Sequence, residues 1–368
     1  MSRRNSRFTL FSFVLALAVL LGACATPTPV VIKETVEVKE TVQVPATVEV
    51  QKVVEVTPTP APARKLKVFG AFATPLEEPW DNAIHTALLA AQQRGDIDYK
   101  WTDNIGYAGD MERVLREEAT KENPYIIFGD AFGNRDGVAK VASEFPAIAF
   151  VFGSDGGPQN PNLGVFDNWI HEPAYLCGLI AGKMTQSNTI GVVAALPIPE
   201  VNRLVNAFMQ GVKEVNPDAK VTISFINSFF DPAKAKEATL ALIDAGADVI
   251  YAEREGAIEA AAEKKLFSFG SLTDQNAEAP DYVLTGPLWN MGPTVDYVIQ
   301  QVKAGAFTAQ DLKDFSLMVK GGADLAPYHG NESKIPADVL DLVKQKREAI
   351  VNGTFRVDIN EAPPPSGQ

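Results

Sequence analysis

Residues able to perform catalysis are scattered through this sequence and form no motif. The three histidines, His85, His171 and His329, have no second ligand at a spacing typical of a metal site. The patterns GxSxG and HExxH, which mark an activated serine and a zinc protease, do not occur. Residues 178–185 come nearest to a phosphate-binding loop, but the spacing is one residue short and Met184 stands where serine or threonine is needed. We therefore expect a binding protein, with no catalytic residue, cofactor or metal.

Acidic and aromatic residues follow the ends of several expected strands. Asp130 and Phe132 come shortly after the apolar run at residues 124–128, and Glu253 follows the run at 248–251. A carboxylate in such a place can accept hydrogen bonds from a ligand, and a phenyl ring can provide a flat wall. Asp130 could equally cap its own glycine-containing loop. These residues predict a ligand site where the strands end.

Short apolar strands alternate with amphipathic helices from Lys65 onward. In a first block we expect strands at 66–72, 98–102, 124–128 and 147–152, and helices at 80–94, 110–122 and 138–145. The pattern then restarts, with strands at 189–195, 220–226, 248–251 and 266–270 and helices at 200–215, 232–245 and 256–265. Two such blocks predict an α/β fold of two doubly wound, parallel-sheet lobes joined by a hinge. Ligands bind beyond the carboxyl ends of parallel strands, so two facing lobes would close on one.

The composition excludes one class of partner. The formal net charge is −13 over 368 residues, whereas a nucleic-acid-binding protein needs a basic face. We expect a monomer that binds a small molecule and no nucleic acid. Only two cysteines occur, Cys24 and Cys177, and Cys177 lies in an apolar helical stretch typical of a core residue.

The amino-terminal residues resemble an export signal. Arg3, Arg4 and Arg7 precede an apolar run at residues 8–21, which at about 14 residues is short for a membrane span. The run ends in Leu-Gly-Ala-Cys at 21–24, which resembles the lipobox of bacterial lipoproteins. We therefore expect residues 1–23 to be a signal peptide and Cys24 to be acylated, the alternative being an ordinary signal peptide.

Residues 24–63 differ from the rest of the chain in composition. A Thr-Val-Glu-Val pattern repeats there every six residues between Thr-Pro pairs. One repeated strand has nothing to pair with, and the prolines favour an extended chain, so we expect a low-complexity tether. A β-structured stalk or a self-association segment is the alternative. At the other end, residues 361–368 are expected to form a disordered tail.

Four sequence segments together resemble one family; they lie at residues 179–191, 197–203, 231–238 and 242–250. They are similar to the basic membrane lipoprotein family, the PnrA-like substrate-binding proteins of ABC importers, and the similarity covers about residues 65–355. The resemblance implies the type I periplasmic-binding fold, an ABC permease as partner and a place outside the cytoplasm, anchored to the cell membrane. It also implies a purine nucleoside as ligand or, as in more similar members, a bare purine base.

The resemblance also carries over site residues, loop by loop. An aromatic residue followed by a polar one lies after the first strand in the family, which points to Trp80 as a stacking face and to Asp81 or Asn82 on the edge of the ring. Trp80 could instead pack on its own lobe. The opposite stacking face corresponds to Phe229, with Phe230 as the alternative. Asp274 matches an aspartate that accepts hydrogen bonds from ribose hydroxyl groups.

One position departs from the family pattern. Nucleoside-binding members carry a lysine where this chain has Trp289. Loss of that donor puts ribose recognition in doubt, and an indole could fill the volume of the sugar. The departure favours a nucleobase or an altered nucleoside.

The resemblance fixes approximate domain bounds and leaves other functions open. We expect a two-lobed domain at 64–360, with lobe 1 at about 64–185 plus part of 285–320 and lobe 2 at about 186–284 plus part of 320–356. Alternative functions are a receptor of this fold for riboflavin, a sugar or a signalling molecule, a nucleoside-processing enzyme, and a surface adhesin.

Overall fold

The computed structural model describes residues 65–154, 156–159 and 161–365. The predicted signal peptide, Cys24 and the predicted tether lie outside the described residues. Within the described part of the chain, no helix combines the length and the apolar character that crossing a membrane requires.

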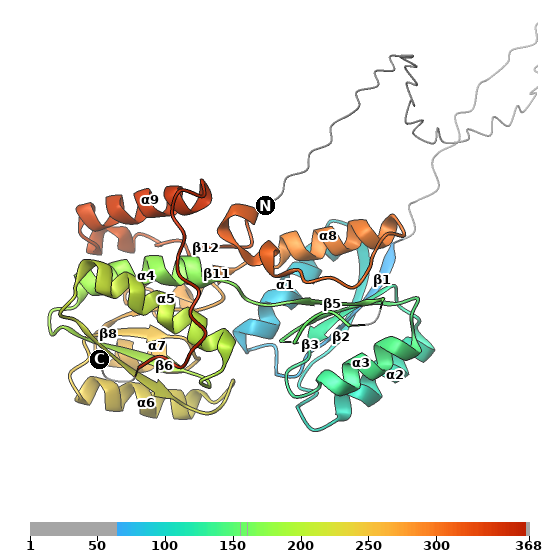
Figure 1. Ribbon diagram of the computed structural model, residues 1–368. Coiled ribbons are helices and arrows are strands. Elements are labelled where there is room, and N and C mark those ends of the chain that lie inside the picture. Colours follow the sequence, from blue (N-terminus) through green and yellow to red (C-terminus); the bar gives the residue numbers. More distant parts are fainter. Residues whose placement is uncertain (1–64, 155, 160, 366–368) are drawn as a thin grey trace, which may run out of the picture. The chain divides into compact units, whose positions relative to one another are not determined.

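The first lobe is built on a parallel five-stranded sheet in the order β2-β1-β3-β4-β5. Its strands are β1 (Leu66–Ala71), β2 (Ile97–Thr102), β3 (Ile126–Asp130), β4 (Ala149–Gly153) and β5 (Leu163–Phe166). Its helices are α1 (Pro79–Gln93), α2 (Asp110–Lys121) and α3 (Arg135–Glu144). Neighbouring residues of one strand enter different cores: Val68 packs with the residues of α1, whereas Phe69 packs with those of α2 and α3. Helices therefore cover both faces of the sheet, as expected for a doubly wound lobe (Figure 1).

The second lobe repeats this plan with the strand order β10-β9-β8-β6-β7, all parallel. Its strands are β6 (Thr189–Ala194), β7 (Lys220–Phe225), β8 (Val249–Ala252), β9 (Phe267–Phe269) and β10 (Val283–Thr285). Its helices are α4 (His171–Met184), α5 (Pro199–Val215), α6 (Pro232–Asp244) and α7 (Ala257–Glu263). The predicted α/β fold of two parallel-sheet lobes is confirmed.

Glycines let helices α4 and α5 approach closely. A Cβ atom on Gly178 would lie 2.0 Å from the carbonyl oxygen of Phe208, and one on Gly211 would lie 2.1 Å from that of Tyr175. Any larger residue would push the helices apart. The glycines that faintly resemble a phosphate loop therefore serve helix packing. Because α4 packs on α5 and α9, it belongs to the second lobe, and the first lobe ends near Phe166, earlier than the expected residue 185.

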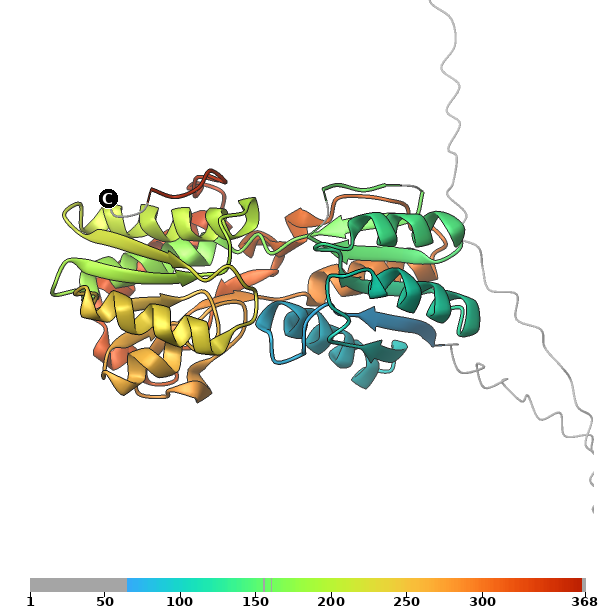
Figure 2. The ribbon, with the colours of Figure 1, turned by 90° about the horizontal axis from the view of Figure 1, so that it is seen from below.

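The chain passes between the lobes in several segments (Figure 2). One follows β5, and two others pair as the antiparallel strands β11 (Pro287–Trp289) and β12 (Ala323–Leu325). Helix α8 (Gly292–Lys303) packs on α1, and α9 (Ala337–Val351) packs on α4. Short 3₁₀ helices complete the connections: η1 (Asn276–Glu278), η2 (Lys313–Ser316), η3 (Met318–Lys320) and η4 (Asn331–Lys334).

The segment after α9 lies along α5 (Figure 1). Asn206 donates to the carbonyl oxygens of Asn360 and Ala362, and the buried Arg203 pairs with Glu361 at 2.7 Å and Asp167 at 2.8 Å. The beginning of the predicted disordered tail is thus held in place, because side chains of α5 bind its backbone and the carboxylate of Glu361.

Candidate ligand-binding site

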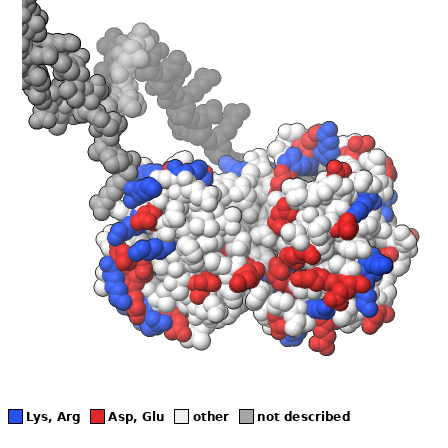
Figure 3. All heavy atoms as spheres, turned by 180° about the vertical axis from the view of Figure 1, so that it is seen from behind, with Lys and Arg blue, Asp and Glu red and all other residues white. Residues whose placement is uncertain are grey.

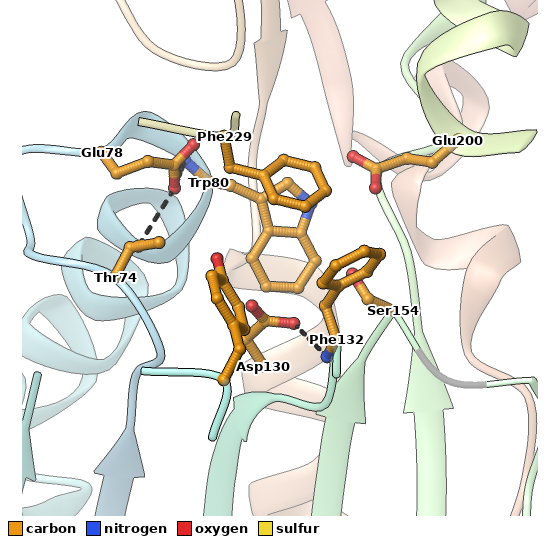
Figure 4. A pocket seen from close by; sticks show the side chains of 9 residues that line it. Thr74, Glu78, Trp80, Asp130, Phe132, Ser154, Glu200 and Phe229 are labelled. Atoms are coloured by element: carbon orange, nitrogen blue, oxygen red, sulfur yellow. Dashed lines mark hydrogen bonds between the residues drawn. The ribbon is translucent and has the colours of Figure 1, made fainter. Parts of the chain in front are cut away.

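A pocket opens where the carboxyl ends of strands from both lobes meet (Figure 4). Its volume is about 250 Å³, counting the space open to solvent. The first lobe supplies most of the lining, and the second supplies the first turn of α5 and the loop after β7. The lining residues are Thr74, Glu78, Trp80, Tyr107, Asp130, Phe132, Ser154, Glu200 and Phe229.

Trp80 forms one wall of the pocket, and its ring is held by packing against two other aromatic residues. Only 6% of the residue is exposed, its ring stacks on Phe166 at 5.8 Å and 19°, and it contacts Trp289 at 5.0 Å. Gly153 leaves space for the indole, since a Cβ atom there would lie 2.0 Å from the Trp80 ring. This packing holds one face of the pocket rigid before any ligand arrives.

Three further rings form the opposite side of the pocket. Phe132 of the first lobe meets Phe229 of the second edge-to-face, with centroids 4.6 Å apart and planes at 77°. Tyr107 packs edge-on against Phe132 at 5.7 Å. In the part of the chain that the structure describes, no ring contact joins Trp80 to Phe229. The rings therefore leave a slot between two walls, one of which spans both lobes.

A buried ion pair links the lobes beside this slot. Glu78 caps α1 by accepting from the backbone N–H groups of Trp80 and Asp81, and its other oxygen lies 2.9 Å from the guanidinium of Arg254. Both side chains are 2% exposed. Arg254, which follows β8 in the second lobe, also pairs with Glu253 at 2.5 Å. Burial raises the pKa of Glu78, and Arg254 opposes that rise.

Two more acids line the pocket, and only one of them accepts a hydrogen bond from the described residues. Asp130 accepts from the N–H group of Phe132 at 2.8 Å, and burial together with the charge of Asp81 raises its pKa well above the ordinary value. Glu200 is 7% exposed and accepts no hydrogen bond from the described residues. Burial and the nearby Asp167 raise the pKa of Glu200. Ser154, also in the lining, has a φ of 54°, a left-handed backbone that is strained for a non-glycine residue.

Comparison with known proteins identifies the family. The profile of the PnrA-like ABC transporter substrate-binding proteins matches residues 73–320.

This chain belongs to the PnrA-like family of ABC transporter substrate-binding proteins.

Relatives and solved structures agree with this assignment. A purine-binding protein of Brucella abortus is 32% identical over 262 residues, covering 70% of this chain and 72% of its own. A Haloferax volcanii protein named as an ABC transporter glucose-binding protein is 36% identical over 281 residues, covering 76% and 70%. The structure of an ABC transporter solute-binding protein from Aeropyrum pernix superposes with a TM-score of 0.68 at 19% identity, covering 80% of this chain and 94% of its own. That last likeness concerns the fold.

Four of the residues predicted for the site line the pocket of this PnrA-like protein: Trp80, Asp130, Phe132 and Phe229. Asp81 is not in the lining, because its carboxylate accepts from the N–H and hydroxyl groups of Thr74 at 3.0 and 2.6 Å. Asn82 is also engaged elsewhere, since it donates to the carbonyl oxygen of Leu76 at 2.8 Å. Both side chains fix the loop that enters α1.

Three other predicted residues lie outside the pocket lining. Glu253 is buried behind it and accepts from Arg254 and from the N–H group of Ala195. Asp274 pairs with His329 at 2.7 Å on the surface, where the two side chains are 38% and 42% exposed. Trp289 supports the back of Trp80 and donates to the hydroxyl group of Ser316 at 2.9 Å. The structure thus gives Trp289 a packing role in place of the expected one of filling the volume of a ribose.

Sequence reasoning missed several residues of this PnrA-like site: Thr74, Glu78, Tyr107, Ser154, Glu200 and Arg254. For two of them a signal was present. Glu78 precedes a proline and Glu200 follows one, each after a strand, as is typical of acids at the start of a helix. Among the described residues no cluster of three or more His, Cys, Asp or Glu is arranged to hold a metal ion.

Proposed function

We propose that this chain is the lipid-anchored receptor of an ABC importer and that it carries a purine base between its lobes. The export signal and Cys24 support the anchor, which would hold the protein to the outer side of the cell membrane without spanning it. The permease of the importer would be its protein partner, and the protein would act as a monomer.

The observation that carries this proposal is the slot between Trp80 and the ring cluster of Phe132, Tyr107 and Phe229. Stacking of a base on an aromatic ring contributes about 1–3 kcal/mol, and it needs a flat wall on each side. Trp80 gives a fixed wall from the first lobe, and Phe229 brings a ring from the second. A ligand that touches both would favour the closed arrangement of the lobes.

The size of the pocket favours a bare base over a nucleoside. Small-molecule sites commonly measure about 300–1,000 Å³. Apart from the part that is open to solvent, the lining encloses little more than the space of a water molecule, and Trp289 adds bulk behind Trp80. Entry of a base therefore requires the lobes to open, and a nucleoside, which carries a ribose as well, would require still more room.

The charges around the slot favour a ligand that donates hydrogen bonds. Glu78, Asp130 and Glu200 line it, and no lysine or arginine is among the lining residues. Purine bases carry N–H groups that a carboxylate accepts, whereas a phosphate would meet no cation in this lining. On the face of the molecule in Figure 3, basic side chains are interspersed with acidic ones, which fits a small-molecule receptor better than a nucleic-acid-binding protein.

A sugar is the second candidate, because the relative at 36% identity is named as glucose-binding. Carboxylates accept from hydroxyl groups as well as from N–H groups, so the lining acids suit both ligands. A base and a sugar differ in how the aromatic rings of the pocket would contact them. Stacking on both faces is expected for a base.

Thermal unfolding of the purified full-length chain tests the proposal with adenine, guanine, hypoxanthine, adenosine and glucose as probes. A ligand at 100 times its dissociation constant adds about 2.7 kcal/mol to the free energy of unfolding, which is readily detected. We expect a base to raise the unfolding temperature more than adenosine does. A shift with glucose and none with any base would overturn the proposal in favour of a sugar receptor.

A further inference from the structure

Glu200 differs from the other buried acids near the pocket. Glu78, Asp81, Asp130 and Glu253 each accept at least one hydrogen bond from protein groups. Glu200 is 93% buried and accepts none from the described residues, although its carboxylate faces the pocket from the second lobe (Figure 4). Its surroundings include Asp167, Arg203 and Arg254, whose charges act on it without a hydrogen bond.

Buried polar groups are nearly always hydrogen-bonded, because leaving water without a new partner is costly. A pocket-facing carboxylate with both oxygens unused is therefore a place where a ligand supplies the partner. The first lobe offers a second unused group: the indole N–H of Trp80 is buried and has no partner within the described part of the chain. An unused acceptor and an unused donor thus stand on opposite lobes around the same slot.

Position in the helix suits Glu200 for this role. It follows Pro199 in the first turn of α5 and lies in the pocket lining. Helix α5 is anchored along α4 through the glycine contacts, so the backbone that carries Glu200 is held in place. A fixed backbone limits the positions that the carboxylate can reach, which favours selectivity for one ligand geometry.

We propose that Glu200 is the specificity-determining residue of the second lobe and accepts hydrogen bonds from an amino-substituted heteroaromatic base held in the slot. This inference rests on the proposed function and names its ligand class: planar bases that present an exocyclic amino group, alone or next to a ring N–H. Bases without an amino group leave Glu200 unsatisfied in the closed protein. Contact with Glu200 also ties the ligand to the lobe opposite Trp80.

The test compares adenine and guanine with unsubstituted purine as probes, using isothermal titration of the full-length chain and of Glu200→Gln. The variant keeps the size of the side chain but replaces one acceptor oxygen with a donor, which opposes the amino group. We expect the unaltered protein to bind at least one aminopurine about tenfold or more tightly than purine, and Glu200→Gln to lose most of that preference. Glu255→Gln is the matched control, since Glu255 is half-buried on the same lobe but already accepts from Gln275 and does not line the pocket.

The outcomes separate this inference from the proposed function. If the unaltered protein binds none of the purines, the proposed function fails and the inference falls with it. If it binds them and Glu200→Gln keeps the same preference, or loses affinity for all three probes equally, the inference is overturned while the proposed function stands. A preference that disappears in Glu200→Gln and persists in Glu255→Gln supports the assignment.

Discussion

The two walls of the pocket are built in different ways. On the first lobe, Trp80 is packed against Phe166 and Trp289, and Glu78 and Asp130 accept from backbone N–H groups. On the second lobe, Phe229 is only partly buried, and Glu200 has no hydrogen-bond partner among the residues described. The rings and acids of the first wall are held in place without a ligand, although the indole N–H group of Trp80 has no partner among the described residues. The second wall leaves the carboxylate of Glu200 unpaired.

This difference indicates that the two lobes contribute to ligand binding in different ways. A preformed wall lowers the entropy lost on binding, because its side chains are already ordered. An incomplete wall gains most from the ligand and therefore couples binding to closure of the lobes. The pair of Glu78 and Arg254 joins the two, since Glu78 caps the helix that carries Trp80 while Arg254 belongs to the second lobe.

Replacing the aromatic residue of either wall should have the largest effect on stability and binding. Trp80→Ala removes a core residue, so we expect it to lower the free energy of unfolding by about 3–5 kcal/mol and to abolish binding of the base. Phe229→Ala should cost much less stability, because that ring is partly exposed, yet weaken binding about 10-fold or more through lost stacking. Denaturant unfolding and titration of each variant measure both quantities. Equal losses of stability in the two variants would contradict the division between a rigid and an incomplete wall.

Removing the cation between the lobes should have the next largest effect. Arg254→Met leaves Glu78 and Glu253 buried without their charged partner, which costs about 3 kcal/mol or more. Part of the loss should appear as an opening of the lobes, detectable as a larger radius of gyration in small-angle X-ray scattering without ligand. The double variant with Glu78→Gln should recover part of the stability. An unchanged radius together with no recovery would show that this pair does not link closure to Trp80.

The dependence of stability on pH should report on a buried acid of the second lobe, Glu255. Burial, reinforced by Glu278 and Glu259, raises the pKa of Glu255 to about 8 from the ordinary 4.5. The folded state therefore holds this proton more tightly, and its contribution to stability is full below about pH 4.5 and is lost as the pH rises through about 8. Discounted for partial exposure, the loss between pH 7 and pH 9 is about 1 kcal/mol, or about 2 °C in unfolding temperature. Glu255→Gln should show a correspondingly smaller drop over that interval, and an identical drop in both proteins would refute this origin of the pH dependence.

The smallest effect is expected for Asp274. Its pair with His329 is exposed, and such pairs contribute about 0–1 kcal/mol. Asp274→Ala should therefore leave base affinity within about twofold and change stability by under about 1 kcal/mol. A large loss of affinity in calorimetry would mean that Asp274 reaches the ligand after all, as the resemblance implied from the sequence.

The sequence predicted elements well where periodicity is local. The expected strand at 66–72 is β1 at Leu66–Ala71, and the expected helix at 80–94 is α1 at Pro79–Gln93. Placement of α4 failed because an apolar helix buried nearly all round carries no sign of which lobe it joins. That information lies in its glycine contacts with α5, which exist only once both helices are formed.

The same difference between local pattern and long-range contact applies to prediction of the site. Phe132 was predicted from its place after a strand and Trp80 from the family resemblance, and the structure places both in the pocket lining. Arg254 was missed because its importance comes from distances across the two lobes, which no short pattern records. Glu78 and Glu200 carried a signal for the start of a helix, but that signal does not show that they line a pocket. Asp274 lies beyond the end of β9 and pairs with His329 on the surface, whereas Asp130 is the last residue of β3.

A crystal structure of the protein with its best-binding purine base would test the central claim most directly. We expect one base to lie between the faces of Trp80 and Phe229, with Glu200 within hydrogen-bond distance of an N–H group of the base. A base bound elsewhere, or Phe229 still packed edge-to-face on Phe132 with the slot empty, would contradict it.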